Sequence, residues 1–179
     1  VVYIASSDQL FYASRNRGTF LIEQASRQQI HDGACPSLTR EKLEKISKQL
    51  FCNKLADCSH MVCLRSRSHD EEEISQVMRE LGTDRWTTSG SFGIKCALIA
   101  MGKADLYVNA CKKTHYWDSC APGIIAREAG AVIVDMDGQE LSYTGVPSET
   151  VHEVVMFTTL ATCKEKVMHA VQKVYASRR

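Results

Sequence analysis

The run from Trp117 to Val134 constrains the fold more than any other stretch, because it predicts a helix followed directly by a buried strand. Asp118 occupies the position of a helix N-cap, where a carboxylate accepts hydrogen bonds from the first free backbone N–H groups. Gly130 ends the predicted helix, since the residue beyond the last turn often needs the positive φ that glycine adopts without strain. The apolar run Val132–Val134 then predicts a buried strand. One carboxylate is therefore expected at the start of a helix.

Two roles remain open for Asp118 on local grounds. The carboxylate can cap the helix and do nothing more, or it can cap the helix with one oxygen while the other oxygen faces a cation. Asp is among the commonest N-cap residues, so the local features favour the cap alone. The choice between these roles depends on the rest of the chain.

The composition is that of an ordinary globular domain. The chain has 179 residues, of which 44% are hydrophobic and 24% charged. That length predicts a single domain over residues 1–179 with enough apolar side chains for a core. Lys and Arg number 22 against 21 Asp and Glu, which gives a net charge of +1. This balance argues against nonspecific binding of a nucleic acid polymer or a membrane surface, so an anionic ligand must be met by local placement of cations.

Cysteine usage and the lack of long apolar runs predict a soluble, cytoplasmic protein. The eight Cys residues are widely spaced and form no C-x-x-C motif, unlike those of a small disulfide-linked scaffold. Cys63 and Cys96 lie within apolar runs, where Cys commonly behaves as a small buried hydrophobe. The sequence shows no secretory signal pattern and no run approaching the ~20 apolar residues of a membrane span.

Hydrophobic periodicity predicts strands interleaved with helices, the pattern of a layered α/β or α+β fold. The first three strands, separated by polar turns, predict an antiparallel meander. Strands are expected at Val1–Ala5, Leu10–Ser14, Thr19–Ile22, His60–Leu64, Ala104–Val108, Val132–Val134, Leu141–Tyr143 and Val154–Thr158. Helices are expected at 39–51 with Thr39 as the cap, at 71–81, before Gly102, after Asp118, and at 160–176; residues 24–37 and 109–116 are expected to be loops.

Two polar turns precede predicted helices and carry groups suited to an anion. The turn from Arg65 to His69 lies between a buried strand and the helix at 71–81. Free backbone N–H groups converge at such helix starts, and α/β sheets place anion sites there. The small-residue turn from Thr87 to Ser91 leads into a helix with Lys95 in its first turn, and its glycine permits close approach of a ligand. A phosphate would fit beside these groups.

Each of these features also has a purely structural interpretation. Ser and His near a helix start are commonly caps, and Lys95 can be a lysine that snorkels out of a buried helix. Lys112, Lys113 and His115 could line an anionic pocket, although a basic loop is usually solvated. The acidic run Asp70–Glu73 is best explained as a first helical turn, where the macrodipole favours negative charge.

Several motifs together resemble the inositol monophosphatase superfamily, the lithium-sensitive, Mg²⁺-dependent phosphomonoesterases. The run Trp117–Pro122 (W-D-S-C-A-P), followed by Glu128–Gly130 (E-A-G), is similar to the family's C-terminal signature. Residues 1–21 are similar to its V-x-Y…L-F-Y-A segment, and residues 90–107 to G-[GS]-x-G-x-K followed by E-G-K-A-x-x-Y. The resemblance covers nearly the whole chain, but only the C-terminal part of the family pattern.

This resemblance implies a fold and a reaction. The fold would be the C-terminal half of an αβαβα sandwich, and the reaction would be hydrolysis of a phosphate monoester with Mg²⁺ as cofactor. The S-R-S-H element at 66–69 and the W-D-S-C-A-P run are most similar to 3'(2'),5'-bisphosphate nucleotidases, which act on 3'-phosphoadenosine 5'-phosphate. An inositol phosphate phosphatase of the same superfamily is the alternative. A nucleoside bisphosphate or an inositol phosphate is thus the expected small-molecule partner.

The resemblance also implies roles for individual residues. Asp118 would ligate a metal ion, whereas Ser66, His69, Ser91 and Lys95 would bind the substrate and its non-scissile 5'-phosphate. The family's other metal ligands come from a G-E-E-like segment and a D-P-x-D-G-T motif, and neither occurs in this sequence. We therefore expect the catalytic residues in an N-terminal half that the chain does not contain. An active enzyme requires that half, as further residues or as a complementing fragment.

A protein of another class remains the rival interpretation. A truncated, noncatalytic relative would bind a nucleotide or a partner chain through the surface that the N-terminal half would cover. An apolar surface of that size would favour a homodimer.

Overall fold

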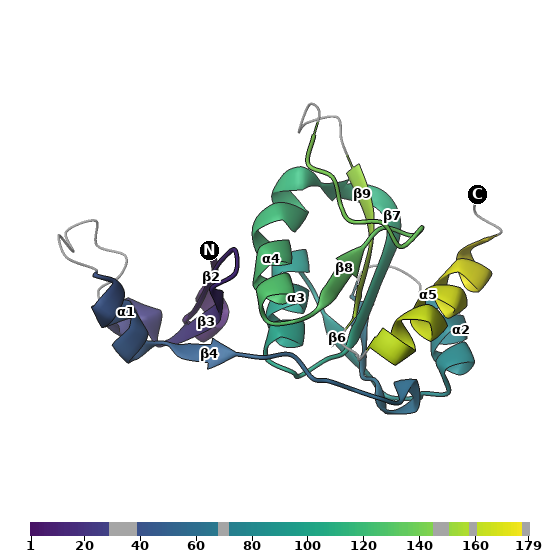
Figure 1. The fold of residues 1–179 in the computed structure, drawn as a ribbon, viewed down its shortest axis with the longest axis horizontal. Coiled ribbons are helices and arrows are strands. Elements are labelled where there is room, and N and C mark those ends of the chain that lie inside the picture. Colours follow the sequence, from purple (N-terminus) through teal and green to yellow (C-terminus); the bar gives the residue numbers. More distant parts are fainter. Residues whose placement is uncertain (29–38, 68–71, 145–150, 158–160, 177–179) are drawn as a thin grey trace.

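Two β-sheets alternate with two pairs of helices in this protein (Figure 1). A computed structural model describes residues 1–28, 39–67, 72–144, 151–157 and 161–176. A four-stranded sheet, sheet A, is followed by a layer formed by α3 (Phe92–Ala100) and α4 (Tyr116–Glu128). A five-stranded sheet, sheet B, comes next, and α2 (Glu72–Leu81) and α5 (Ala161–Tyr175) cover its outer face. These layers confirm the predicted layered α/β fold.

Sheet A is the expected N-terminal meander with one strand added. Its strands pair in the order β1 (Val2–Ile4), β2 (Gln9–Ser14), β3 (Gly18–Glu23) and β4 (Lys48–Leu50), and every pair is antiparallel. The three predicted strands of the meander are therefore confirmed. The fourth strand comes from a segment for which the sequence predicts a helix.

The helix predicted over 39–51 is correct in its first half only. α1 spans Arg40–Ile46, and the Thr39 hydroxyl caps it by accepting the Lys42 N–H at 3.3 Å. The chain beyond α1 becomes β4, where Leu50 pairs with Thr19 and is buried. An apolar residue at this spacing satisfies a helical period and an extended strand equally well, so the pairing with sheet A decides between them.

Sheet B places three parallel strands side by side. The strand order is β6 (Trp86–Ser89), β5 (Cys63–Ser66), β7 (Leu106–His115), β9 (Val151–Phe157) and β8 (Val132–Val134). β5 is parallel to β6 and β7, whereas β9 is antiparallel to β7 and β8. The carboxyl ends of β5, β6 and β7 therefore point to one edge of the sheet, which is where α/β proteins place ligands.

Two predicted strands of sheet B have different limits in the structure. β5 begins at Cys63 rather than at His60, because residues 58–60 form a 3-10 turn capped by Asp57. β7 continues past residue 108 to position 115, where the sequence predicts a loop. It does so through a register shift against β9 between Asn109 and Thr114. A polar segment can extend a strand when its backbone finds a partner, and β9 supplies one here.

Two further corrections concern short segments. The small-residue turn predicted from residue 87 is mostly the strand β6, whose residues pair with β5. Leu141–Tyr143 does not form the predicted strand, and between residues 139 and 144 the structure has only an isolated bridge from Glu140 to Val134. β8 matches its predicted range, and β9 contains the described part of the predicted strand that begins at residue 154.

The predicted helices at 71–81, before Gly102 and at 160–176 are confirmed as α2, α3 and α5 over their described residues. Residues 71 and 160 lie outside the described ranges. Across those ranges, no helix combines the length and the apolar character needed to cross a membrane.

The core follows the layers, since sheet B is buried on both faces. On its outer face, Leu106 and Phe157 belong to one cluster with Val77 of α2 and Val167 of α5. The inner face packs on α3 and α4 through Leu64, Tyr107, Val154, Met156, Cys96, Ile99 and Ala126. The other sides of α3 and α4 meet sheet A in a cluster that contains Phe11, Leu21, Ala97, Ala100, Ile125 and Ala129. α3 and α4 are thus held between two sheets, which makes them rigid supports for any site at their N-termini.

The two Cys residues predicted to be buried are fully inside this core. Cys63 and Cys96 are 0% exposed. Burial raises the pKa of the Cys63 thiol to about 12 and also raises the pKa of the Cys96 thiol. Both thiols stay protonated at neutral pH, so they act as small hydrophobic side chains.

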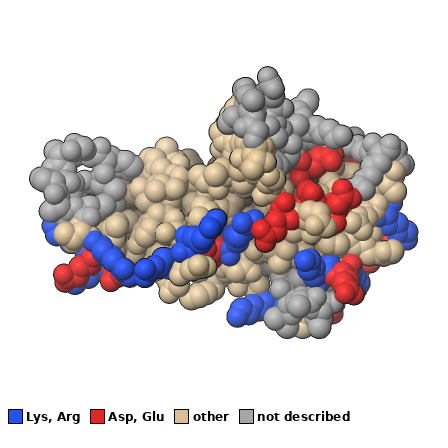
Figure 2. Space-filling model, turned by 45° about the horizontal axis from the view of Figure 1, so that its top comes forward, with Lys and Arg blue, Asp and Glu red and all other residues tan. Residues whose placement is uncertain are grey.

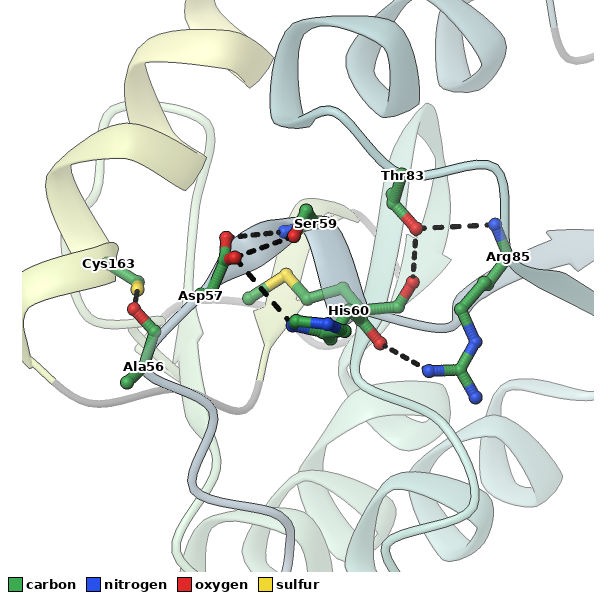
Figure 3. Close-up of polar contacts among 8 residues, drawn as sticks. Ala56, Asp57, Ser59, His60, Thr83, Arg85 and Cys163 are labelled. Carbon is green, nitrogen blue, oxygen red and sulfur yellow. Dashed lines mark hydrogen bonds and ion pairs between the residues drawn. The ribbon is translucent and has the colours of Figure 1, made fainter.

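The segment that crosses from sheet A to sheet B is held by polar contacts just before β5 (Figure 3). Asp57 accepts the backbone N–H of Ser59 at 2.9 Å and its hydroxyl at 2.7 Å. The Cys163 thiol of α5 donates to the carbonyl oxygen of Ala56 at 2.9 Å, and Arg85 Nη1 donates to a carbonyl of the 3-10 turn at 3.0 Å. These bonds fix the beginning of the strand whose other end carries Ser66.

The C-terminus of α4 has the geometry that the sequence predicts. Gly130 has a φ of 103°, and its N–H bonds the carbonyl oxygen of Arg127 at 2.9 Å. The N–H of Ala131 bonds the carbonyl oxygen of Ala126 at 3.0 Å. This pair of bonds is a Schellman motif, which ends the helix and directs the chain into β8.

Glu128, in the last turn of α4, connects that helix to sheet A. Its carboxylate accepts the backbone N–H groups of Asn16 at 2.9 Å, Arg17 at 3.2 Å and Gly18 at 3.0 Å, all in the turn between β2 and β3. These hydrogen bonds favour the ionised form and so hold the pKa of Glu128 below its ordinary value. The hydrogen bond from Asn16 has the largest effect.

Glu128→Gln is expected to destabilise the protein at neutral pH and to do so less in acid. The lowered folded-state pKa means that the carboxylate contributes stability above its unfolded-state pKa of about 4.3, and that this contribution is lost as the pH falls through the folded-state pKa. The side chain is only partly buried, so solvent screening limits the expected difference to roughly 0.5–1 kcal/mol. Urea unfolding of both proteins, from neutral pH down through the folded-state pKa of Glu128, measures this difference in the free energy of unfolding. A difference that does not shrink in acid would contradict the assigned role.

Candidate functional site

Lys95 and Ser66, two predicted substrate-binding residues, are in contact at the carboxyl edge of sheet B. Ser66 is the last residue of β5, and Lys95 lies about one turn into α3. Lys95 Nζ donates a hydrogen bond to Ser66 Oγ at 3.0 Å. The Lys95 side chain is only 4% exposed, so it does not snorkel into solvent. The fold therefore holds a cation and a hydroxyl together where the parallel strands end.

Tyr107 of β7 completes the surroundings of this amine. Lys95 Nζ lies 3.4 Å from the Tyr107 hydroxyl and 4.5 Å from the centre of its ring. An ammonium over an aromatic ring is stabilised by the electron-rich face of the ring. Tyr107 pairs with Leu64 of β5, so it lies beside the strand that carries Ser66.

The N-terminus of α3 adds hydrogen-bond donors to the same place. Ser91 is the N-cap, its carbonyl oxygen accepts the Lys95 N–H at 3.2 Å, and its side chain makes no capping bond in the described structure. The first N–H groups of a helix have no partner within the helix, and the macrodipole gives them a partial positive charge. Ser66, Ser91, Lys95 and Tyr107 are hereafter called the anion subsite.

Asp118 lies in the first turn of α4, but it is not the N-cap that the sequence predicts. α4 begins at Tyr116, and its N-cap is His115. The helix begins earlier than predicted because β7 extends to that residue. As the third helical residue, Asp118 accepts the His115 N–H through Oδ2 at 3.0 Å, which is the reach-back bond of a capping box. The carboxylate is at the helix start, as expected, in a different capping position.

The other groups around Asp118 are His115 and Trp117. His115 Nδ1 lies 3.8 Å from Asp118 Oδ2, and the side chains of these two residues are 32% and 41% exposed. The rings of His115 and Trp117 stack with centroids 4.3 Å apart and an angle of 6° between their planes. One carboxylate oxygen is thus engaged at a rigid position, and the side chain remains accessible. Asp118 and His115 are hereafter called the carboxylate subsite.

Asp118 fits the role of one Mg²⁺ ligand. Mg²⁺ is usually held by one or two carboxylates together with waters and substrate phosphates. In the part of the chain that the structure describes, no group of three or more His, Cys, Asp or Glu side chains is placed to hold a metal ion. The carboxylate subsite therefore offers one carboxylate to a cation, and a complete metal site would need further groups.

The two subsites lie on neighbouring helices, and the first turn of α3 packs against the second turn of α4. A Cβ on Gly93 of α3 would lie 3.8 Å from Pro122 Cγ of α4, so little space separates the helices there. Among the described contacts, none joins Asp118 to the anion subsite.

The remaining predicted residues cannot be placed. His69 and Asp70 lie outside the described residues, as do the side chains of Lys112 and Lys113. Their roles stay predictions.

Sequence reasoning did not single out Tyr107 or Arg67. Successive side chains of a strand lie on opposite faces of a sheet. This alternation along β7 was the signal that could have placed Tyr107 on the opposite face of sheet B from Leu106. Arg67 belongs to the polar turn after β5, but only the structure shows that its guanidinium lies against Gly90.

Charges of both signs lie on the face that Figure 2 draws. Figure 2 shows basic side chains in a band along one face, with a group of acidic side chains beside it. This mixture agrees with the net charge of +1, and Lys95 differs from the charges drawn in being buried.

Together, the layers and the two groups of residues define an α/β protein with a buried lysine and a carboxylate at the carboxyl edge of its parallel strands. The sequence matches the model of the inositol monophosphatase family over residues 1–174. The chain belongs to this family.

Curated relatives are similar to part of the chain. The chain is 39% identical over 79 residues to the 3'(2'),5'-bisphosphate nucleotidase CysQ of Salmonella typhimurium, a match that covers 44% of this chain and 31% of that protein. It is 29% identical over 93 residues to 3'(2'),5'-bisphosphate nucleotidase 1 of Mus musculus, covering 52% and 30%. The matched segments thus span about a third of the length of these relatives.

The solved structures show the shared fold at lower identity. A hypothetical protein from Pyrococcus horikoshii, described as similar to inositol-1 monophosphatase, superposes with a TM-score of 0.64 and 19% identity, covering 94% of this chain and 54% of that one. An inositol monophosphatase from Anabaena gives 0.63 and 16%, covering 96% and 59%. The chain corresponds to just over half of each structure, in agreement with the predicted half of an αβαβα sandwich.

Proposed function

We propose that the chain serves a Mg²⁺-dependent, lithium-sensitive phosphomonoesterase that removes the 3'-phosphate of 3'-phosphoadenosine 5'-phosphate in the cytoplasm. The observation that carries the proposal is the buried Lys95 held by Ser66 at the carboxyl edge of sheet B. A buried ammonium carried near the start of a helix suits a phosphate group that is held but not cleaved. The bisphosphate nucleotidase names of the curated relatives support the choice of substrate.

Each subsite then takes one end of the substrate. In the anion subsite, Lys95 Nζ, the hydroxyls of Ser66 and Ser91 and the first N–H groups of α3 bind the 5'-phosphate, and His69 is a further proposed ligand. In the carboxylate subsite, Asp118 holds Mg²⁺, and the His115 N–H keeps one of its oxygens oriented. When bound, Mg²⁺ supplies neutralisation of the scissile phosphate and activation of the attacking water. The groups that position this water are proposed to come from an N-terminal half.

Hydrolysis of an inositol phosphate is the second candidate. The family model and the solved structures favour it, since both carry inositol monophosphatase in their descriptions. An inositol monophosphate has one phosphate, so it would fill the carboxylate subsite and leave the anion subsite without its ligand.

Phosphate release from 3'-phosphoadenosine 5'-phosphate and from inositol 1-phosphate tests the proposal. Both esters are assayed with and without Mg²⁺ and Li⁺, on material whose intact mass is recorded. Release from the nucleotide that needs Mg²⁺ and is blocked by Li⁺ is the expected result. Preference for the inositol ester would select the second candidate.

The state of the polypeptide in the assay decides between an enzyme and a binding protein. Activity that appears only with a copurifying fragment would identify the proposed N-terminal partner. A folded chain of 20.0 kDa, or its homodimer, that releases no phosphate would overturn the enzymatic proposal for this polypeptide.

A further inference from the structure

We infer that Arg67 binds the non-scissile phosphate and makes the site selective for esters that carry a second phosphate. This inference rests on the proposed function and adds a residue to the anion subsite. Arg67 follows Ser66 directly, at the point where β5 ends. It therefore stands next to the hydroxyl that contacts Lys95.

The guanidinium lies flat against the backbone that begins α3. Three of its atoms, Nη2, Cζ and Nε, are 3.5, 3.6 and 3.7 Å from the position that a Cβ on Gly90 would occupy. Nearly equal distances to three atoms of a planar group mean that its face, rather than its edge, is turned to Gly90. Its N–H groups then lie in a plane turned toward Gly90, the residue before the Ser91 N-cap of α3.

The other arginine of this turn has a different environment. Arg65 Nη2 donates to Ser75 Oγ of α2 at 2.7 Å, and its guanidinium lies 4.7 Å from the centre of the Trp86 ring. Those contacts join Arg65 to α2 and β6. Arg67 is exposed, and no carboxylate within the described ranges forms an ion pair with it. Of the two cations, Arg67 is the one that can meet a ligand.

The chemistry of the group fits a phosphate. A guanidinium presents parallel N–H groups that match two oxygens of a phosphate, whereas an ammonium acts as a point charge. Arg67 and Lys95 would contact a terminal phosphate from two sides, with the α3 N–H groups between them. An ester without this second phosphate gains nothing from Arg67, so the residue acts on the choice of substrate.

Calorimetric binding to the 179-residue chain tests the inference without requiring catalysis. The ligands are adenosine 3',5'-bisphosphate, adenosine 5'-phosphate and adenosine 3'-phosphate. Arg67→Ala is expected to weaken the first two by about tenfold or more, the size of a charge-assisted hydrogen bond, and to leave the third within about twofold. Arg67→Lys should give an intermediate loss, because the charge stays and the fork is lost. Arg15→Ala, at another exposed arginine, is the matched control and should change none of the three.

Each other outcome has a defined meaning. Binding of the bisphosphate that Arg67→Ala leaves unchanged overturns the inference but not the proposed function. An equal loss for all three ligands also overturns it, since Arg67 would not distinguish the second phosphate. If the wild-type chain binds none of the nucleotides, the proposal that the substrate is a nucleotide is overturned together with the inference.

Discussion

Asp118→Asn is expected to lower Mg²⁺-dependent phosphate release by about 100-fold or more, with little change in stability. The Mg²⁺ bond needs the carboxylate charge, and even groups that only support metal ligands are worth about 10–100-fold in activity. The hydrogen bond from the His115 N–H to Oδ2, at 3.0 Å, needs only an oxygen acceptor, which Asn retains. The substitution therefore separates the metal role from the helix cap. It is measured as kcat at saturating Mg²⁺, beside the midpoint of urea unfolding.

Asp137→Asn is the matched control for this change. Asp137 lies in the turn after β8, away from the first turn of α4, and its substitution should leave kcat unaltered. Full activity of Asp118→Asn would remove Asp118 from the metal site. A large loss of stability with a proportionate loss of activity would assign it a capping role alone, the other role left open by the sequence.

Lys95→Met is expected to weaken nucleotide binding by about 10–100-fold, the size of one or more charge-assisted hydrogen bonds, while kcat changes much less. Lys95 lies in the subsite for the phosphate that is not cleaved, so its loss should appear in KM. Met matches the length of the side chain and fills the same buried space without a charge. The substitution removes the contacts of Lys95 with Ser66 and Tyr107 but also the cost of burying an ammonium, so stability should stay within about 1 kcal/mol of the wild type.

Lys103→Met provides the comparison at an exposed lysine just beyond the end of α3, and it should alter neither KM nor stability. The readouts are KM for 3'-phosphoadenosine 5'-phosphate, the affinity of the folded chain for the same ligand, and the free energy of unfolding. An unchanged KM for Lys95→Met would show that the buried amine does not bind the ligand. Its role would then be structural, as in its contact with Tyr107.

The sequence predicts well those elements whose structure is set by neighbouring residues alone. The Gly130 stop, the strand Val132–Val134 and the N-terminal meander each depend on residues close in the chain, and each forms in its predicted place. The same holds for the Thr39 cap. The resemblance to the inositol monophosphatase family rests on such local motifs, and it specifies the predicted layered fold as the C-terminal half of an αβαβα sandwich.

The predictions from the sequence are wrong where the structure of a segment depends on its pairing with residues far away in the chain. Leu50 satisfies the period of a helix, but its pairing with Thr19 makes it part of a strand. The polar segment after Asn109 shows no strand pattern, yet β9 pairs with it up to His115. That extension moves the start of α4, so Asp118 becomes the third residue of the helix rather than its cap.

The sequence by itself determined which chemical groups are available: one carboxylate at a helix start, a lysine behind a small-residue turn, and a serine at the end of a strand. Only the tertiary structure decided how they meet. Three parallel strands bring Ser66 and Tyr107 to one edge, and α3, held between two sheets, places Lys95 against both. The physical reason is that hydrogen bonds within a turn or cap depend on neighbouring residues, whereas a buried cation is stable only where residues far apart in the chain surround it together.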